Sequence, residues 1–557
     1  MRLADRRRVF AFGWREVWRR FCRRSAGLRL LFSPLPVPDR LIVAPTDLRS
    51  LDPFIAEEIF EGRFPLAGRI LETYGQSPFS VELPSKAFAE RLHAFAWLRH
   101  IRANKTEEAC ANAREIVSDW MAVHGRRPKG LAWESHVVAE RVIAWLSHST
   151  VVLQGAEAGF YRRFMKSLAY QVRYLRKIAG CLPKDETRLK IRIALAMASV
   201  SMPTRTGYIR REGARLDREL ESQILADGGH VSRNPRVMLD ILMDLLPLRQ
   251  TYINLGHDLP QKLIPTIDRI YPALRFFRHQ DGDLALFNGA TATPASLLMS
   301  VLRYDESGGK PSKTLPHMNY HRLSADATTL IADTGYSSPD VARSAHAGSL
   351  AFEMSSGRHR FIVNCGAPTF AGRGHRNIAR STAAHSTLIL DETSSSRILK
   401  PKLVGSILLP GVSEVAVERW EDPHGNDWLR ASHDGYLRDY GYKHEREIGL
   451  NAAGNKIKGH DKLFVPEGHE AGDETLTAIV RFHVHPSIKL SRRDAESVMM
   501  SANDGERWLF TAPGLELLID EDIFFADVSG ARPSQQLAIE FSLPGTTEVR
   551  WMLRRGE

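Results

Sequence analysis

The sequence predicts a multidomain protein with an all-helical N-terminal half and a C-terminal antiparallel β-sandwich. The chain of 557 residues is too long for one hydrophobic core, so two or three domains are expected. Apolar residues recur every three or four positions from about residue 50 to about residue 300. After about residue 320 they alternate with polar residues in short runs instead. This change of period indicates a domain boundary near residue 320.

The first half consists of amphipathic helices in series. Short breaks such as GRRPKG and ADGGHVS separate them, which predicts that neighbouring helices pack antiparallel. Helical pairs in this number favour a bundle, a solenoid or a closed toroid, and the sequence shows no residue-level repeat, which weakens the solenoid. The predicted helices cover residues 87–103, 106–124, 135–150, 162–179, 186–202, 211–225, 234–256 and 263–279.

The second half consists of short strands divided by turn residues. So many short strands in series indicate a large antiparallel sandwich. Residues 306–320 form the predicted linker between the halves. The alternating runs lie at residues 328–335, 349–366, 386–392, 413–420, 429–437, 444–450, 477–491, 506–520, 536–543 and 548–554.

The net charge of +11 is concentrated at the N-terminus. Residues 1–30 hold ten arginines against two acidic residues, which leaves only +3 for the other residues. A body with so little excess charge is not expected to bind nucleic acid. The four cysteines, at positions 22, 110, 181 and 365, show no C-x-x-C spacing, so neither a zinc knuckle nor a disulfide scaffold is expected.

The arginines of residues 1–30 are mixed with large apolar side chains. This pattern suits a basic amphipathic helix in peripheral contact with an anionic membrane surface. A secretory signal is not expected, because no apolar run of about 7–15 residues follows the arginines. A solvated arm or a mis-assigned start codon is the alternative. The apolar residues are Val9, Phe10, Phe12, Trp14, Val17, Trp18 and Phe21.

Five stretches carry a resemblance to a known family. They are 227–252 (DGGHVSRNPRVML and onwards), 344–368, 380–396 (RSTAAHSTLILDETSSS), 431–446 (ASHDGYLRDYGYKHER) and 481–486 (RFHVHP). In this order they resemble the heparinase II/III-like polysaccharide lyases. The resemblance implies an incomplete (α/α) toroid over 36–320 and a β-sandwich over 321–557, preceded by the basic segment 1–35. It also implies that an acidic polysaccharide lies in a cleft between the two domains.

The resemblance implies a carbon–oxygen lyase that cleaves a uronate-containing polysaccharide by β-elimination. Such a reaction needs a group that neutralises the carboxylate, a base for the C5 proton and an acid for the departing oxygen. We expect Tyr436, His346, His385, Asn234 and Arg236 to converge with these roles on one cleft between the toroid and the sandwich. Hydrolysis would instead need two carboxylates.

The Gly-initiated turn before residue 235 is the predicted uronate clamp. His230, Arg233, Asn234 and Arg236 lie around the start of a helix, where backbone N–H groups add positive potential. The alternative is a simple N-cap, with Asn234 preceding Pro235 at the first helical position.

The chain departs from the family pattern at two pairs of positions. Many relatives carry a Tyr-His pair where this chain has Val237 and Met238, and an Asn-His pair near Thr187 and Arg188. Arg188 or Arg192 could replace the neutraliser, and Tyr208 or Tyr252 could replace the acid. Packing is the alternative for a helical tyrosine. The active site is therefore expected to be degenerate in part.

A zinc site is implied by the resemblance at His346, Asn364 and His385. Relatives hold the ion with His, Asp and His, whereas this chain has the amide Asn364, which lowers the charge of the site. We therefore expect zinc to be weak or absent, and no cofactor to be required. Otherwise the two histidines brace the floor of the site, or one of them serves as the base.

The run HDGYLRDYGYKHEREIGL, residues 433–450, provides the main proton-transfer candidate. Tyr436 needs a positive neighbour to act as a base, and His433, His444 or Arg446 could be that neighbour and contact substrate. The alternative is a tyrosine packed between two sheets. The histidines of RFHVHP are expected to be structural.

Two other functions stay open. One is a toroid-fold glycoside hydrolase, for which Asp185, Glu186 and Asp227 are the candidate acids. The other is a non-catalytic protein that binds acidic carbohydrate or accompanies polysaccharide biosynthesis. The family is mostly periplasmic or envelope-associated, but no cleavable signal is visible, so a cytoplasmic or inner-membrane-associated location is also open.

Overall fold

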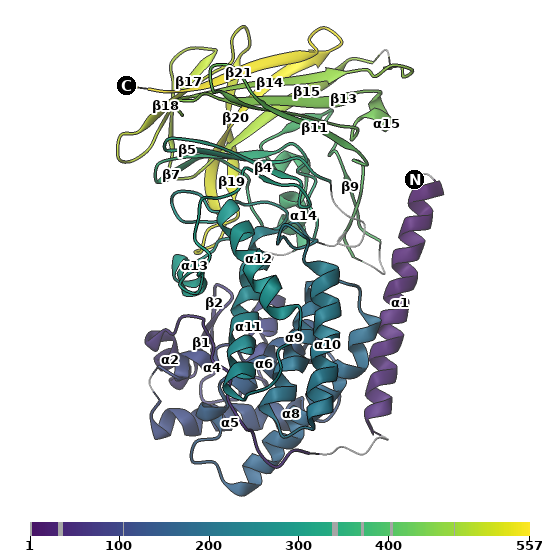
Figure 1. Cartoon of the computed structure of the whole chain (residues 1–557), viewed down its shortest axis with the longest axis vertical. Coiled ribbons are helices and arrows are strands. Elements are labelled where there is room, and N and C mark those ends of the chain that lie inside the picture. The colour runs from purple at the N-terminus through teal and green to yellow at the C-terminus, as the bar shows by residue number, and fades with distance from the viewer. Residues whose placement is uncertain are drawn as a thin grey trace. The chain divides into compact units, whose positions relative to one another are not determined.

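The computed structural model describes residues 3–31, 37–103, 105–336, 344–368, 373–401, 405–472 and 474–556. The chain forms two compact units (Figure 1). The helical unit comprises Met1–Ile224, Leu239–Asp268 and Ser296–Glu306. The strand unit comprises Leu225–Met238, Arg269–Ala295 and Ser307–Glu557. The strand unit therefore includes two segments from within the predicted helical range.

Helices dominate the first 300 residues, as the periodicity predicts. Their N-termini are capped by side chains that the sequence supplies, since Thr106 Oγ1 accepts from Ala109 N at 3.1 Å and Asp185 Oδ1 accepts from Arg188 N at 3.0 Å. A short hairpin, β1 (Arg63–Leu66) with β2 (Arg69–Glu72), precedes α3. The helices are α2 (Pro53–Phe60), α3 (Lys86–Ala94), α4 (Leu98–Ile101), α5 (Glu107–Val123), α6 (Ser135–Ser147), α7 (Ser149–Val152), α8 (Ala158–Ile178), α9 (Glu186–Ser201), α10 (Thr206–Gln223), α11 (Pro235–Asn254), α12 (Leu263–Phe276) and α13 (Ala295–Leu302).

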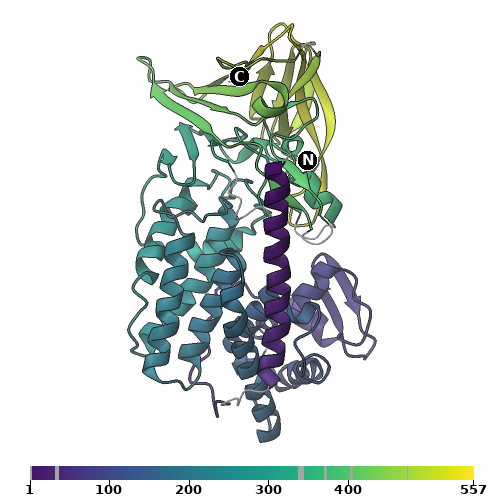
Figure 2. The same cartoon turned by 90° about the vertical axis from the view of Figure 1, so that its right-hand side faces the viewer.

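The basic N-terminal segment forms the long helix α1 (Leu3–Leu31), which contacts α8 (Figure 2). One side of α1 is buried at Asp5, Glu16 and Cys22. The opposite side carries a stripe of exposed large apolar side chains. Among the described helices, none combines the length and the hydropathy needed to cross a bilayer. The stripe consists of Phe10, Trp14, Val17, Trp18 and Phe21, which are 45–74% exposed.

The strand unit contains two large antiparallel sheets (Figure 1). The eight-stranded sheet has the order β11-β12-β13-β14-β21-β18-β17-β16, and the nine-stranded sheet has the order β19-β20-β15-β7-β6-β5-β4-β3, with β8 also paired to β15. The strands are β3 (Thr314–Leu315), β4 (Tyr320–Ala325), β5 (Thr328–Asp333), β6 (Phe352–Ser356), β7 (His359–Val363), β8 (Leu388–Leu390), β11 (Val415–Glu421), β12 (Asp427–His433), β13 (Lys443–Leu450), β14 (Lys456–Phe464), β15 (Leu476–Val484), β16 (Lys489–Arg492), β17 (Ser497–Ser501), β18 (Arg507–Thr511), β19 (Leu517–Phe524), β20 (Arg532–Leu543) and β21 (Glu548–Arg555).

The core of the strand unit draws side chains from both sheets. Trp551 of β21 stacks on Phe352 of β6 with ring centroids 5.5 Å apart, and Phe482 of β15 meets Phe510 of β18 at 4.7 Å. All four rings are at most 2% exposed. Aromatic side chains contribute the largest buried areas, so these contacts fix the two sheets face to face. The predicted fold class is confirmed.

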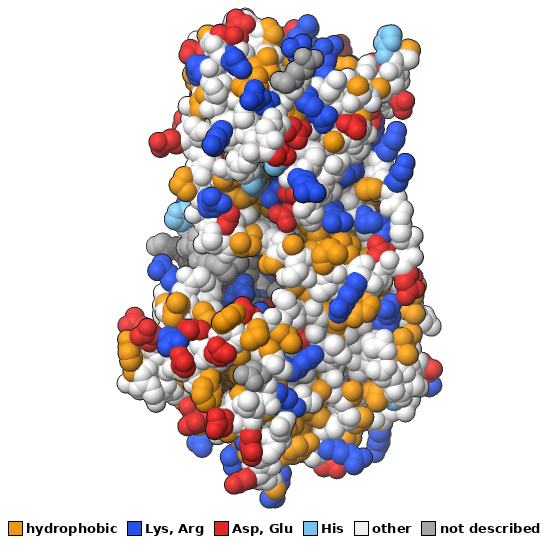
Figure 3. All heavy atoms as spheres, turned by 90° about the vertical axis from the view of Figure 1, so that its left-hand side faces the viewer, with side chains coloured by type: hydrophobic (Ala, Val, Ile, Leu, Met, Phe, Trp, Pro, Cys, Tyr) orange, Lys and Arg blue, Asp and Glu red, His pale blue; other side chains and the backbone are white. Residues whose placement is uncertain are grey.

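The face seen in Figure 3 carries both basic and acidic side chains, with several acidic ones gathered at its lower left. This agrees with the near-neutral charge of the chain beyond residue 30, which is +3.

Candidate functional site

The turn before α11 is held in place by glycines and by Asp227. A Cβ on Gly228 would lie 1.9 Å from the carbonyl oxygen of Arg269, and one on Gly229 would lie 1.9 Å from the sulfur of Met318. Only glycine fits at both positions. Asp227 Oδ2 accepts from the backbone N–H groups of residues 317 and 318 at 2.8 Å each. The turn is therefore anchored to the segment that leads into β4.

Arg233 is a structural residue of this turn. Its Nε donates to the carbonyl of Met318 at 2.7 Å, and its Nη2 contacts the Asp333 carboxylate. The guanidinium also lies 4.8 Å from the centre of the Tyr320 ring. Arg233 is 7% exposed and has φ +60°, so the surrounding contacts hold an unfavourable backbone conformation. The predicted substrate-binding role of Arg233 is wrong, because its donors are directed to protein groups.

His230 is also structural. It is completely buried, and its Nδ1 accepts from the backbone N–H of Ser232 at 3.1 Å and lies 2.8 Å from the Ser232 hydroxyl. Burial lowers the pKa of His230 to about 3, so the ring is neutral in the folded protein. A buried neutral ring cannot contact a polysaccharide, which contradicts the predicted substrate-binding role.

Asn234 and Arg236 begin α11 as the capping interpretation predicts. Asn234 Oδ1 accepts from the backbone N–H of Arg236 at 2.9 Å. The Arg236 side chain reaches the carbonyl of Ala292 at 2.9 Å, and this contact attaches the helix start to the 285–295 segment. The half-buried guanidinium and the Asn234 amide nitrogen keep a role in binding as a prediction.

His346 and His385 form a buried pair. His346 Nδ1 lies 3.2 Å from His385 Nε2, and His385 Nδ1 lies 2.7 Å from the carbonyl oxygen of Ser381. A carbonyl can only accept, so His385 Nδ1 carries the proton and its Nε2 accepts from His346 when both rings are neutral. Burial lowers the pKa of both rings, to about 4 for His385. The rings are therefore neutral near pH 7.

Gly289 makes room for a small polar cradle. A Cβ at this position would lie 3.4 Å from Asn234 Nδ2, 3.4 Å from His346 Nε2 and 3.5 Å from the carbonyl oxygen of Ser344. Gly289 has φ +93°, which also favours glycine. The cradle brings together Asn234 and His346, and His346 contacts His385, all within the strand unit. The Arg236 guanidinium is directed to Ala292 instead, and convergence of the five expected residues on one site stays a prediction.

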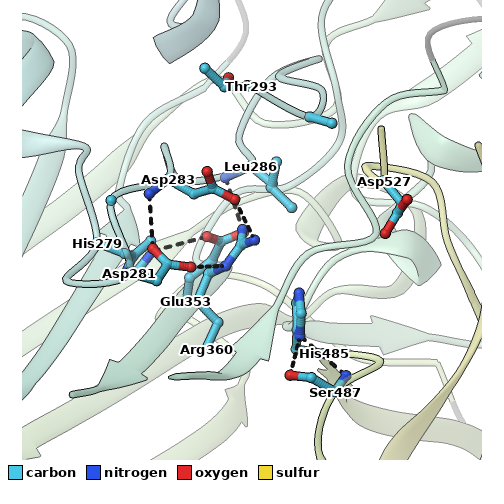
Figure 4. Close-up of polar contacts among 12 residues, drawn as sticks. His279, Asp281, Asp283, Leu286, Thr293, Glu353, Arg360, His485, Ser487 and Asp527 are labelled. Carbon is cyan, nitrogen blue, oxygen red and sulfur yellow. Dashed lines mark hydrogen bonds and ion pairs between the residues drawn. The ribbon is translucent and has the colours of Figure 1, made fainter. Parts of the chain in front are cut away.

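Asn364, the third expected zinc ligand, makes hydrogen bonds within the protein. Figure 4 shows the neighbouring Glu353 and its partners. Its Nδ2 donates to Glu353 Oε1 at 3.2 Å, and its Oδ1 accepts from the backbone N–H of Ser386 at 3.0 Å. Glu353 is fully buried and also lies 3.1 Å from His279 Nε2. An amide suits this position because it can donate to a carboxylate that an aspartate would repel. Weak or absent zinc at His346 and His385 stays a prediction.

The crowded run of residues 433–450 spans the end of β12, the short helix α15 (Leu437–Tyr440) and β13, and several of its polar side chains are buried. His433, His444 and Arg446 are at most 2% exposed. Asp461 on β14 lies 2.8 Å from His444 Nε2 and accepts from Arg446 Nε at 2.7 Å and from Trp551 Nε1 at 2.8 Å. The Arg446–Asp461 ion pair is thus buried together with its hydrogen-bond partners. The predicted contact of His433, His444 and Arg446 with substrate is wrong, because their partners lie inside the strand unit.

Tyr436 belongs to the same interior. It is 1% exposed, packs in the core cluster of the two sheets, and donates its hydroxyl to the carbonyl of Leu388 at 2.9 Å. Burial raises its pKa far above the usual value, which opposes ionisation. The packing alternative therefore describes Tyr436, and the predicted proton-transfer role is contradicted.

The two candidates in the helical unit are also engaged or buried. Arg188 Nε donates to Glu219 at 2.9 Å, and its Nη1 donates to the carbonyl of Leu182 at 3.1 Å. Tyr252 is 1% exposed, and burial raises its pKa to about 12. Neither side chain presents the neutraliser or acid that was predicted for it. Val237 and Met238, at the positions where the resemblance implies a Tyr-His pair, are buried apolar residues.

A basic groove in the helical unit was not predicted. It has a volume of about 760 Å³ and lies where residues 37–39 pass α8, α9 and α10. Arg173, Arg176, Lys177 and Arg205 line it together with Tyr208. In the sequence these basic residues look like the solvated faces of two helices, because their approach depends on how the helices pack.

Comparison with known proteins identifies the family. Residues 307–552 match the family described as "Heparinase II/III-like, C-terminal". "Crystal Structure of Heparinase III" aligns with a TM-score of 0.72 at 14% identity, covering 95% of this chain and 89% of that one. "Crystal structure of heparan sulfate lyase HepC mutant from Pedobacter heparinus" aligns with a TM-score of 0.62 at 16% identity, covering 96% and 87%.

The class of protein follows from these matches. Residues 307–552 match the heparinase II/III-like C-terminal family, and the chain as a whole has the fold of heparinase III. The fold predicted from the sequence is thus confirmed, and the family match holds for residues 307–552. Among curated proteins, "FtsZ-localized protein C" of Caulobacter vibrioides is 29% identical over 549 residues, covering 96% of this chain and 93% of the relative.

Proposed function

We propose that this chain is a heparinase-fold protein that does not cleave polysaccharide and that localises with FtsZ at an anionic membrane surface. The observation that carries the proposal is the similarity to FtsZ-localized protein C, which extends over 96% of the chain. The burial of the candidate proton-transfer residues supports the loss of catalysis. The exposed apolar stripe of helix α1 supports the membrane contact.

Elimination needs an acid and a base that reach a sugar ring. Of the predicted proton-transfer residues, Tyr436 and Tyr252 are each 1% exposed. The family's Tyr-His positions hold Val237 and Met238, whose aliphatic side chains cannot transfer a proton. A neutral His346 remains beside the Gly289 cradle together with Asn234, which could help to neutralise a carboxylate. His385 has both ring nitrogens engaged, by His346 and by the carbonyl of Ser381, so the His346 imidazole alone would have to supply both proton transfers.

Loss of catalysis is tested by incubating the full chain with a panel of uronate-containing polysaccharides. We expect no unsaturated product, which would absorb in the ultraviolet. Absorbance that grows with time in the wild type and is abolished in His346→Ala would overturn this part of the proposal. New reducing ends without absorbance would indicate a hydrolase instead.

The membrane contact is proposed for the exposed stripe of α1. Residues 10, 14, 17, 18 and 21 follow the 3.6-residue period on one side of the helix, and the arginines of residues 1–30 would contact anionic headgroups. Each apolar side chain that enters the interface contributes on the order of 1–2 kcal/mol, and each basic residue near the surface about 1 kcal/mol.

Co-sedimentation with vesicles tests this contact. Anionic vesicles should bind the full chain more tightly than zwitterionic vesicles of equal size. Trp14→Glu and Trp18→Glu should each weaken the binding about tenfold or more. Phe54→Glu is the matched control, because Phe54 is 76% exposed but lies on α2. Equal losses in all three variants would contradict a specific role for α1.

Localisation with FtsZ is tested with a fluorescent fusion in cells of the organism that encodes the chain. We expect the fusion to coincide with FtsZ, and deletion of residues 1–31 to reduce its membrane association while the remaining fold persists. A fusion distributed independently of FtsZ would refute the proposal, whatever the outcome of the polysaccharide assay.

A second candidate function is the binding of acidic carbohydrate at the Gly289 cradle. The specific observation in its favour is that Asn234 Nδ2 and His346 Nε2 face the same space, 3.4 Å from the position of a Gly289 Cβ. Titration with uronate oligosaccharides should then show binding that Gly289→Ala removes. Unchanged binding in Gly289→Ala would eliminate this candidate.

A further inference from the structure

Three metal-ligating side chains converge at one end of the nine-stranded sheet. Cys365 follows β7, His483 lies on β15 and Asp522 lies on β19. Cys365 Sγ is 3.3 Å from His483 Nδ1, which is 2.7 Å from Asp522 Oδ2, and the sulfur is 3.7 Å from both carboxylate oxygens. Among the described residues, this is the one group of three such side chains whose ligand atoms all lie within 4.8 Å of one another.

The arrangement differs from a hydrogen-bonded catalytic triad. A triad uses both nitrogens of the histidine, one toward the nucleophile and one toward the carboxylate. Here the thiol and the carboxylate both approach Nδ1 of His483, while its buried Nε2 has no hydrogen-bond partner among the described residues. A single N–H donates well to only one acceptor. Three metal-ligating atoms of the kinds that zinc prefers, all within 4.8 Å of one another, are instead typical of a cation site.

The distances fit a zinc ion with small adjustments. Zinc binds Cys sulfur at about 2.3 Å and His nitrogen or carboxylate oxygen at about 2.0–2.2 Å, which gives ligand–ligand separations of roughly 3.4–3.6 Å in a tetrahedron. The S–N and S–O separations, 3.3 and 3.7 Å, lie within about 0.3 Å of this range. The N–O separation of 2.7 Å would widen by about 0.7 Å, as expected when an ion replaces a hydrogen bond.

The surroundings allow an ion to enter. Cys365 and His483 are 3% and 1% exposed, whereas the side chain of Asp522 is 14% exposed. The Ser534 hydroxyl lies 3.4 Å from Asp522 Oδ2 and could supply or orient the fourth ligand. An ion here would connect β7, β15 and β19, whose contributing residues are 118 and 39 positions apart in sequence.

We propose that Cys365, His483 and Asp522 bind one divalent zinc ion, at a site separate from His346, Asn364 and His385. A sulfur, nitrogen and oxygen donor set suits zinc better than calcium or magnesium, which prefer oxygen alone. Three protein ligands leave one coordination position for water or Ser534.

Metal content of the full chain tests the site directly. Protein stripped with chelator, incubated with zinc and desalted should retain one zinc per chain by elemental analysis. Cys365→Ser and His483→Gln should each reduce the affinity at least about 100-fold, while Cys181→Ser should leave it unchanged. His385→Gln is the second control, because it would remove zinc bound at His346 and His385 instead. Zinc that persists in Cys365→Ser but disappears in His385→Gln would overturn the proposal, and so would a wild type that retains none.

Cobalt substitution gives a readout that does not depend on the variants folding. Cobalt(II) bound by a thiolate shows an intense sulfur-to-metal charge-transfer band in the near ultraviolet, which histidine and carboxylate ligands do not give. The wild type should show this band at one equivalent of cobalt and lose it on addition of zinc. Bound cobalt without the band would exclude Cys365 as a ligand and refute the proposal.

Discussion

Mild acid should destabilise the strand unit through His230. The ring is completely buried, and its Nδ1 accepts from the Ser232 backbone N–H at 3.1 Å. Protonation of Nδ1 would remove the acceptor of the Ser232 N–H and would place a positive charge in a fully buried site. His230 therefore binds a proton less tightly in the folded protein than in the unfolded chain.

The size of the effect follows from the two pKa values. Burial lowers the pKa from 6.5 to about 3 in the folded state. Because the unfolded state binds more protons between these values, stability is fully present above pH 6.5 and is lost as the pH falls toward 3. At pH 5 the ring is still neutral in the folded state, and the pH lies about 1.5 units below the pKa of the unfolded state, so the lost stability is about 2 kcal/mol.

Urea unfolding of wild type and His230→Asn at pH 7.5 and pH 5 measures how much unfolding free energy is lost through His230 on acidification. The asparagine oxygen can still accept from Ser232 but does not titrate. The variant should be less stable at pH 7.5, by about 1–3 kcal/mol for the lost packing, and should lose about 2 kcal/mol less on acidification. Other buried histidines also titrate, so only the difference between the two proteins is assigned to His230.

His317→Asn is the matched control, because His317 is an exposed histidine of the same unit. Its unfolding free energy should change with pH as the wild type does. An identical pH dependence in wild type and His230→Asn would refute the reasoning, since the proton would then be bound equally in both states.

Three further predictions concern buried polar groups of the strand unit. Asp461→Ala should cost about 3–5 kcal/mol in unfolding free energy, because it leaves the buried Arg446 guanidinium without its partner, and a loss below 1 kcal/mol would contradict the ion-pair description. Asn364→Asp should destabilise the fold at pH 7.5 by about 2 kcal/mol or more, because it places a second carboxylate against the buried Glu353, and the deficit should shrink in acid as one of the two binds a proton. Gly289→Ala should cost about 1–2 kcal/mol by unfolding, because φ +93° strains any residue with a Cβ, and a neutral result would show that the backbone relaxes there.

The sequence by itself determined the features that depend on neighbours along the chain. The period of apolar residues separated helices from strands, and the Asn234-Pro235 dipeptide marked the start of α11, where Asn234 accepts from Arg236 N as an N-cap predicts. Five motifs in order also identified the family. These signals are local, since hydrogen bonds and caps within a helix form between residues a few positions apart.

Only the tertiary structure decided which polar side chains face the interior. Tyr436 and His433 look reactive in the sequence, yet strand pairing and sheet packing bury them, and Asp461 on the next strand partners His444 and Arg446. Conversely, Cys365 and His483 lie in two separate motifs that nothing in the sequence links, because β7 and β15 meet only through long-range pairing such as that of Val363 with His483. A strand pattern gives alternation but not the identity of the opposing strand, so long-range pairing decides both the buried network and the candidate metal site.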